Sequence, residues 1–179
     1  HSNRFLFLSK NTKIKNRSIT ADAIITDKKD FPIAVLTADC VPILLFDKKR
    51  KMIAAIHAGW RGAFKGVISK VINFMLKKGC DRKDIIVAIG PSITQKNYNV
   101  KLDFKNKFIK KHKKNKIFFK NRNKLIYFDL PNFIKSQLKL NKISKIDMIN
   151  IDTYNKKNNF FSARRSITLR HDDYRRNIS

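Results

Sequence analysis

Two apolar runs separated by a short charged turn constrain the fold of this chain more than any other feature. Residues 41–46 and 52–57 are almost continuously apolar, and the turn between them reads Asp-Lys-Lys-Arg-Lys. Two such runs joined by a short turn predict a β-hairpin. Because the apolar residues do not alternate with polar ones, we expect both faces of the hairpin to be covered inside a layered α/β arrangement.

Further apolar runs predict the remaining strands of the same domain. We expect strands at 23–26, 33–37, 85–89, 116–120, 125–128 and 146–151. No internal repeat and no flexible linker separates these segments, and strands and helices alternate to the end of the chain. The sequence therefore predicts a single domain over residues 1–179, of the mixed α/β class.

Three segments between the strands carry helical patterns. Apolar residues recur with a period of 3.6 between Phe64 and Leu76, which predicts an amphipathic helix. Residues 100–114 have a less regular helical pattern. Asp129 followed by Pro131 is typical of the N-cap and first turn of a third helix.

The net charge of the chain requires a polyanionic partner to be considered. The 179 residues include 41 Lys and Arg against 13 Asp and Glu, a formal charge of +28. Nucleic acid is the first such partner to weigh. The basic residues are spread over nearly every segment, however, and no nucleic-acid-binding motif appears among them. We therefore rank a nucleic-acid binder below an enzyme and expect no specific nucleic acid as partner.

Cysteine content and hydropathy predict where the protein works. Cys40 and Cys80 are too few to form a disulfide framework. No apolar run approaches the roughly 20 residues needed to span a bilayer, and the N-terminus has no export-signal pattern. We expect a cytoplasmic protein without a membrane partner.

A thiol and an imidazole are predicted to meet at one end of the hairpin. Cys40 immediately precedes the first arm, and His57 closes the second. Because antiparallel partners start and finish at opposite ends, these two residues should lie side by side. They could be two ligands of zinc, or a cysteine nucleophile with a histidine base. A purely structural role in packing is the alternative.

The neighbours of this pair favour a functional interpretation. Asp39 places a carboxylate beside the cysteine, and glycines on both sides of Trp60 and Arg61 free the backbone for close approach. Arg61 lies at the start of the predicted helix. Cations usually avoid the positive end of the helix dipole, so an anion bound at the same place would explain it. A solvated surface arginine is the alternative.

Four motifs along the chain are informative together. They are Thr37-Ala38-Asp39-Cys40-Val41-Pro42, His57-Ala58-Gly59-Trp60-Arg61-Gly62, Ile89-Gly90-Pro91-Ser92-Ile93 with Tyr98-Asn99-Val100, and Phe160-Phe161-Ser162-Ala163-Arg164-Arg165. Their order and spacing resemble the YfiH family of bacterial laccase-domain proteins, related to the mammalian protein FAMIN. The resemblance covers essentially the whole chain. It implies an α-β-β-α sandwich, here lacking the N-terminal stretch that family members carry.

The resemblance also implies a metal site and an activity. Its zinc ligands would be His1, Cys40 and His57. Three protein ligands with an open fourth position are typical of catalytic zinc, which lowers the pKa of its bound water to about 7. The implied reaction is phosphorolysis of purine nucleosides such as adenosine, inosine and methylthioadenosine, with deamination of adenosine as a second activity. Purine nucleosides and phosphate would be the partners.

Individual roles follow from what phosphorolysis requires. Arg61 is the first candidate for binding phosphate, and Arg164 and Arg165 are weaker candidates. Asp39 is the candidate proton shuttle, or a carboxylate that orients His57. The chain departs from the family pattern where many members have Glu and this sequence has Asn, in the Tyr-Asn-Val motif.

Two other activities stay open at this point. Two histidines and a cysteine also form the equatorial ligand set of blue-copper sites, so a copper-dependent polyphenol oxidase is one alternative. The 4 histidines of the chain are few for a laccase with several coppers. A hydrolase that uses Cys40 and His57 to edit cell-wall precursors is the other alternative.

Overall fold

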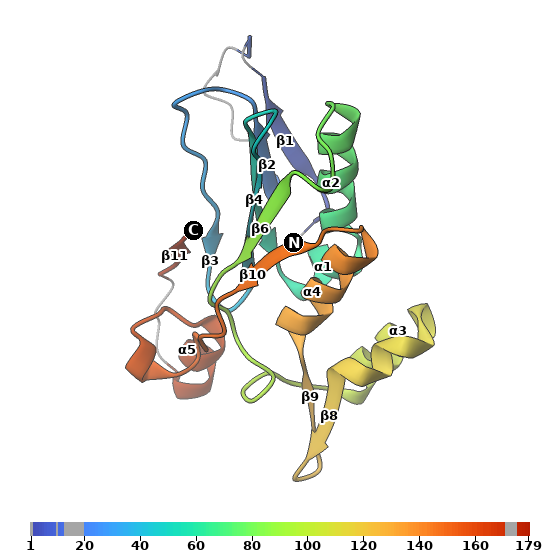
Figure 1. The fold of residues 1–179 in the computed structure, drawn as a ribbon. Coiled ribbons are helices and arrows are strands. Elements are labelled where there is room, and N and C mark those ends of the chain that lie inside the picture. Colours follow the sequence, from blue (N-terminus) through green and yellow to red (C-terminus); the bar gives the residue numbers. More distant parts are fainter. Residues whose placement is uncertain (1, 10, 13–19, 171–174) are drawn as a thin grey trace.

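A six-stranded mixed sheet forms the centre of the computed structural model, which describes residues 2–9, 11–12, 20–170 and 175–179 (Figure 1). The strand order is β1-β2-β5-β4-β6-β10. The bounds are β1 Phe5–Leu8, β2 Ala23–Thr26, β4 Val41–Asp47, β5 Met52–Ala58, β6 Ile85–Ile89 and β10 Lys145–Met148. The predicted hairpin is β4 and β5, paired antiparallel at the middle of the sheet. β1 pairs parallel with β2, and β6 with β10.

Helices α1 (Trp60–Phe64), α2 (Val67–Lys77) and α4 (Leu130–Leu140) pack against one face of this sheet (Figure 1). The predicted continuous helix is divided into α1 and α2 because Gly66 takes a left-handed conformation, with φ at 81°. Within α2 the residues of the predicted apolar stripe are fully buried except Leu76, which is partly buried. The mixed α/β class is therefore confirmed, with this helical layer as one wall of the core.

The opposite face of the sheet is less covered than the sequence predicts. In β4 the side chains of Ile43 and Leu45 are buried, whereas Leu44 is 42% exposed and Phe46 38% exposed. On the neighbouring strand β6, Ile86 is also 38% exposed. On the same face Pro42 and Ala55 are buried, so within the described part of the chain the predicted covering of both faces holds only in part.

A smaller unit extends from the main sheet, as Figure 1 shows for α3, β8 and β9. It consists of β7 (Asn99–Val100), α3 (Leu102–Lys111), a 3-10 helix η1 (Lys113–Phe118), β8 (Phe119–Arg122) and β9 (Leu125–Phe128). Its strands pair in the order β7-β9-β8. The predicted helix and the second predicted strand of this region are confirmed. The first predicted strand starts only at 119, because residues 113–118 form η1 instead.

Aromatic side chains form the interior of this unit. Phe104 stacks on Phe108 with ring centroids 4.7 Å apart, and Phe108 lies 4.8 Å from Phe128. The Trp60 ring contacts Phe104 edge-on at 4.9 Å. These contacts join the extension to the beginning of α1, which directly follows the strand that carries His57.

The C-terminal part returns to the edge of the molecule near β4. A short helix α5 (Ala163–Leu169) follows the 3-10 helix η2 (Lys156–Asn158), and β11 (Asn177–Ile178) pairs with β3 (Leu36–Thr37). β1, α5 and β11 were not predicted from the sequence. The predicted strand 33–37 is shortened to β3, and the predicted strand 146–151 is observed as β10.

The start of α4 follows the prediction closely. The Asp129 side chain accepts a hydrogen bond from the backbone N–H of Asn132 at 3.1 Å, and Pro131 lies in the first turn. The proline has no N–H to leave unsatisfied there, so it suits the first turn of a helix.

Candidate functional site

The predicted thiol and imidazole lie at the same end of the hairpin. In the β4–β5 pairing Val41 is opposite Ala58 and Pro42 is opposite His57. Cys40 therefore precedes its strand where His57 closes the other. Cys40 is half-buried, and the His57 side chain is 22% exposed. Sequence and structure agree on this pair.

Burial shifts both groups towards their uncharged forms. Desolvation, with smaller contributions from the carboxylates of Asp39 and Asp22, raises the pKa of the Cys40 thiol to about 12. Burial also lowers the pKa of His57, against an opposing effect from Asp22. A neutral imidazole is the form that binds a metal ion, and a thiol binds as the thiolate after losing its proton.

Asp22, not Asp39, is the carboxylate beside the His57 imidazole. Nδ1 of His57 lies 3.9 Å from Oδ1 of Asp22, and the His57 backbone N–H donates to the Asp22 carbonyl at 2.8 Å. Asp22 comes just before β2, and β2 pairs with β5, which explains the contact. Sequence reasoning missed Asp22. Its only signal is an acidic residue immediately before a strand.

Ser2 is held next to the same carboxylate. Its backbone N–H donates to Oδ2 of Asp22. Its carbonyl oxygen lies so close to Gly62 that an added Cβ there would come within 2.9 Å of it. Gly62 therefore makes room for this N-terminal segment. The predicted third ligand, His1, lies outside the described residues and stays a prediction.

Asp39 connects three of the four sequence motifs. It is 7% exposed and has a left-handed backbone, with φ at 77°. Its carboxylate accepts hydrogen bonds from Oγ1 of Thr153 at 2.7 Å and from the backbone N–H of Arg164 at 2.6 Å. Its carbonyl accepts from the N–H of Ile93 at 3.0 Å. The Asp39 carboxylate is thus hydrogen-bonded to other parts of the chain, and its role as a proton shuttle or as a carboxylate that orients His57 stays a prediction.

The two arginines that end the fourth motif have different hydrogen-bond partners. Arg165 donates from Nη1 to the carbonyls of Thr153 and Tyr154, both at 2.9 Å, and from Nη2 to the carbonyl of Phe160 at 2.5 Å. Its guanidinium thus binds backbone carbonyls in this structure, and the prediction that Arg165 binds phosphate stays a prediction. Arg164 donates from Nη1 alone, to the carbonyl of Asn99 at 3.1 Å and to the Asn99 side chain.

Arg61 lies at the start of α1, as predicted. Its guanidinium is exposed and stands 4.9 Å from the centroid of the Trp60 ring. Among the described residues, no side chain or carbonyl accepts a hydrogen bond from it. α1 has only five residues, so the helix itself offers little to an anion. Any anion bound here would be bound chiefly by the guanidinium.

A cleft of about 710 Å³ opens beside these arginines. It is lined by Trp60, Tyr98, Asn99, Val100, Lys101, Leu102, Asp103, Phe104, Lys124, Leu125, Ile126 and Arg164. Arg164 stands 5.3 Å from the centroid of the Tyr98 ring. Burial raises the pKa of Tyr98, and the charges of Cys40, Arg164, Asp39 and Arg61 all act on its hydroxyl. Tyr98 thus lies among the candidate residues, although the sequence marked it only as part of a motif.

The donor types at the hairpin end fit zinc. Thiolate and imidazole are its commonest protein ligands, and a carboxylate behind the second imidazole nitrogen is typical of zinc-binding histidines. Within the described ranges, no group of three or more His, Cys, Asp or Glu side chains is arranged to hold a metal ion. The metal site therefore stays a prediction, with Cys40 and His57 at one end of the hairpin and His1 outside the described residues.

In the described parts of the chain, every helix is too short or too polar to cross a bilayer.

Comparison with known proteins relates the chain to one family. Residues 1–171 match the family model described as multi-copper polyphenol oxidoreductase laccase. A purine nucleoside phosphorylase of Rickettsia conorii is 39% identical over 160 residues, which are 88% of this chain. One from Rickettsia prowazekii is 39% identical over 148 residues, which are 82% of it. The chain spans 65% and 61% of the lengths of these relatives.

Solved structures agree on the fold. The Bacillus licheniformis protein YfiH superposes with a TM-score of 0.82, at 24% sequence identity, over 93% of this chain and 67% of that one. A Neisseria meningitidis protein superposes with a TM-score of 0.72 at 28% identity, over 81% of this chain and 59% of that one. The mixed α/β architecture is therefore shared with both.

Proposed function

The chain belongs to the family of multi-copper polyphenol oxidoreductase laccases, and we propose that it is a zinc-dependent purine nucleoside phosphorylase. One observation carries the proposal: Arg164, which lines the cleft and keeps hydrogen-bond donors unused among the described residues, donates its backbone N–H to Asp39, the residue before Cys40 at the hairpin end that also carries His57. The names of the two Rickettsia relatives support the reaction class. The arrangement offers a metal position, an anion position and room for a nucleoside.

Cys40, His57 and His1 would hold the zinc ion. When bound, zinc would supply a Lewis acid and lower the pKa of a coordinated water. Asp22 would fix the orientation of the His57 ring from its Nδ1 side. Since Asp22 also binds the backbone of Ser2, one carboxylate would place two of the three ligand-bearing segments.

Arg61 and Arg164 would bind phosphate. In phosphorolysis an oxygen of phosphate forms a bond to C1′ of the pentose while the bond from C1′ to the purine nitrogen breaks. The electron pair goes to the purine, which takes up a proton and leaves as the free base, and the other product is the pentose 1-phosphate. The guanidinium groups would hold the phosphate for this attack and balance its charge. Asp39 would position Arg164 through the backbone hydrogen bond at 2.6 Å.

Deamination of adenosine is the second activity that we propose for this site. There water takes the place of phosphate, attacks C6 of the purine ring and displaces ammonia, which gives inosine. The cleft beside the metal position would admit either end of the nucleoside. Ammonia and inosine formed without phosphate would measure this activity separately.

The two alternative functions have less support. A cysteine hydrolase needs a thiol with a lowered pKa, whereas burial raises that of Cys40 to about 12. A laccase with several coppers needs many histidines, and the sequence has 4. A strong visible absorption band in copper-loaded protein would favour copper, and turnover that zinc inhibits would favour the hydrolase.

The test is an assay of adenosine with and without inorganic phosphate. We expect zinc-loaded protein to release adenine and pentose 1-phosphate only when phosphate is present. A sample treated with a chelator is the control, and it should regain activity on addition of zinc. If zinc-loaded protein leaves adenosine, inosine and methylthioadenosine unchanged in phosphate buffer, the proposed function is wrong.

A further inference from the structure

We propose that the cleft beside Arg164 is the subsite for the heterocyclic base, held between the start of α3 and the start of β9. This inference rests on the proposed function, and it names the part of the molecule that recognises the substrate. The residues assigned to the base are Trp60, Tyr98, Phe104, Leu102 and Leu125. None of them is a predicted metal or phosphate ligand.

The size and lining of the cleft suit a flat ring. Its volume of about 710 Å³ lies within the range of small-molecule sites, roughly 300–1,000 Å³. Seven of its twelve lining residues are aromatic or aliphatic, and the polar or charged ones are Asn99, Lys101, Asp103, Lys124 and Arg164. Walls of this kind bury the faces of a heterocycle while a few polar groups read its rim.

Two exposed leucines lie together at the cleft. Leu102, the first residue of α3, is 59% exposed, and Leu125, the first residue of β9, is 47% exposed. They come from separate elements but line the same cleft. Exposed apolar side chains that gather at one concave site indicate a surface that a ligand covers. A bound base would remove both side chains from water.

The position of Arg164 gives the cleft a direction. Its backbone N–H is bonded to Asp39, which directly precedes Cys40, so this end of the cleft is the metal end. Its Nη1 is anchored on Asn99, which leaves Nη2 and Nε without hydrogen bonds among the described residues. We therefore place the pentose and phosphate next to Arg164, and the base towards Leu102 and Leu125.

Trp60 allows this assignment to be measured directly. It is the single tryptophan of the sequence, and it lines the cleft. Its ring touches Phe104 at 4.9 Å and stands 4.9 Å from the Arg61 guanidinium. A purine ring bound in the cleft would lie close to this indole and change its fluorescence.

The experiment titrates free adenine into the protein without phosphate and follows Trp60 emission. We expect a saturable change in emission, in zinc-loaded and in chelator-treated protein alike. Leu102→Ala and Leu125→Ala should each weaken adenine binding by about three- to tenfold, since each removes apolar surface that the base covers. Leu140→Ala is the matched control, because Leu140 is 81% exposed on α4 and outside the cleft.

Equilibrium dialysis with the same proteins separates the outcomes. Adenine that binds by dialysis without changing Trp60 emission, or equally well to both cleft variants, would overturn the subsite, and so would an absence of binding. If adenine binds as expected but adenosine is not cleaved, the subsite stands and the proposed function fails. If adenosine is cleaved and the leucine variants keep the wild-type KM, the function stands and the subsite is wrong.

Discussion

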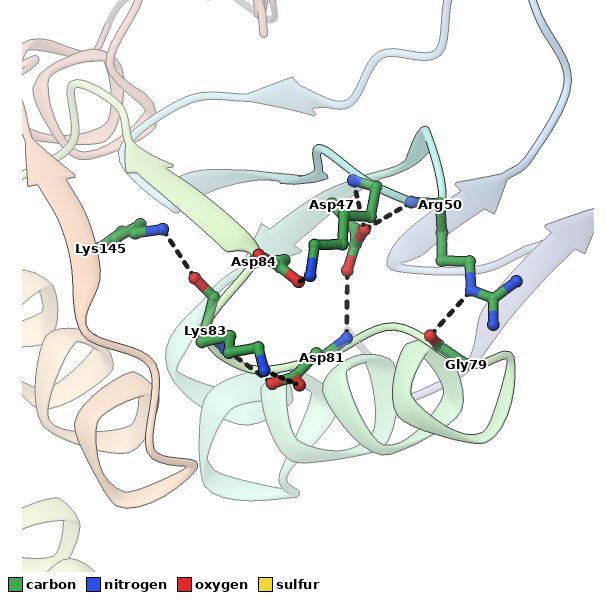
Figure 2. A network of polar contacts seen from close by, with 8 residues as sticks. Asp47, Arg50, Gly79, Asp81, Lys83, Asp84 and Lys145 are labelled. Carbon is green, nitrogen blue, oxygen red and sulfur yellow. Dashed lines mark hydrogen bonds and ion pairs between the residues drawn. The ribbon is translucent and has the colours of Figure 1, made fainter.

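The two ends of the central hairpin carry polar clusters that are built in opposite ways. At the turn end, Asp47 is fully buried and accepts backbone hydrogen bonds from Lys49 at 3.0 Å, Arg50 at 2.7 Å and Asp81 at 3.2 Å (Figure 2). At the other end, called the cleft end, Asp39 directly precedes Cys40 and accepts the backbone N–H of Arg164, which lines the cleft. The turn end satisfies its charges within the chain, whereas the cleft end leaves donors for a ligand.

The surroundings of Asp47 show how complete the internal pairing is. Arg50 donates to the carbonyl of Gly79 at 2.9 Å, Lys49 pairs with Asp84 at 3.0 Å, and Lys83 pairs with Asp81 at 3.2 Å (Figure 2). Burial alone would raise the pKa of Asp47, but the three N–H groups together lower it. This network joins the β4–β5 turn to the segment that leads from α2 into β6. We therefore assign the network around Asp47 a structural role.

The contrast suggests that one end of the β4–β5 hairpin contributes to stability and the other end to function. A polar residue indicates a ligand site when its neighbours leave it incompletely satisfied, and a structural role when they satisfy it fully. By this criterion Arg165, like Asp47, has a structural role, since its guanidinium donates its hydrogen bonds to backbone carbonyls. Arg61 and Arg164 belong with the cleft. Substitutions at the two ends should therefore have different consequences.

The largest effect is expected at the cleft end itself. His57→Ala should reduce phosphorolysis of adenosine by more than about a hundredfold, because it removes a proposed metal ligand. The free energy of unfolding of metal-free protein should change by no more than about 1–2 kcal/mol, since the side chain is partly exposed. Steady-state kinetics and urea unfolding measure the two. Full activity in the variant would remove His57 from the site.

A smaller loss of function is expected from Asp22→Asn. The amide would no longer support the His57 ring as a carboxylate does, so zinc affinity should fall by about 10- to 100-fold. Competition with a chromogenic chelator gives the affinity. Asp147→Asn is the matched control, because Asp147 is exposed on β10 and away from the cleft. Equal affinities in the two variants would contradict the role of Asp22.

A substitution at the turn end should lower the stability of the protein and leave its activity unchanged. In Asp47→Asn an NH2 group replaces one of the two carboxylate oxygens. At least one backbone N–H that donates to Asp47 would therefore lose its hydrogen-bond acceptor. We expect the free energy of unfolding to fall by about 1–3 kcal/mol, with kcat per folded molecule unchanged. Urea unfolding and active-site titration distinguish the two quantities. A loss of kcat without a loss of stability would contradict the claim that the turn end has a structural role only.

The smallest expected effect is a pH dependence at the turn end. Because the pKa of Asp47 is lowered from 3.8 in the folded protein, its stabilising effect is complete above that value. The effect is lost as the pH falls through the lower, folded pKa. The stability difference between wild type and Asp47→Asn should therefore shrink below about pH 4. Urea unfolding at a series of pH values tests this, and a difference that grows in acid would contradict it.

Much of the hairpin end that carries Cys40 and His57 could be predicted from the sequence. Cys40 and His57 lie on the two arms of one hairpin, and the pairing of adjacent arms follows from local apolar runs and a turn. The N-cap at Asp129 is equally local. Such features depend on residues close together in the chain.

Features that depend on distant neighbours could not be predicted. Asp22 reaches His57 because β2 pairs with the edge of β5 that β4 leaves free. Neighbouring arginines on a helix point in different directions, so the sequence could not tell that Arg164 faces the cleft while Arg165 binds the backbone. The sequence also could not show why residue 62 is a glycine, because the group that lies against it is the carbonyl of Ser2, which is distant in the chain.

The central claim is that the Cys40 and His57 end of the hairpin is a zinc site, and the metal content of the purified protein tests it most directly. Elemental analysis should find close to one zinc per wild-type chain and per Asp47→Asn chain, and little zinc in Cys40→Ser. A wild-type protein that takes up no zinc, or a Cys40→Ser protein that retains as much as wild type, would contradict the claim.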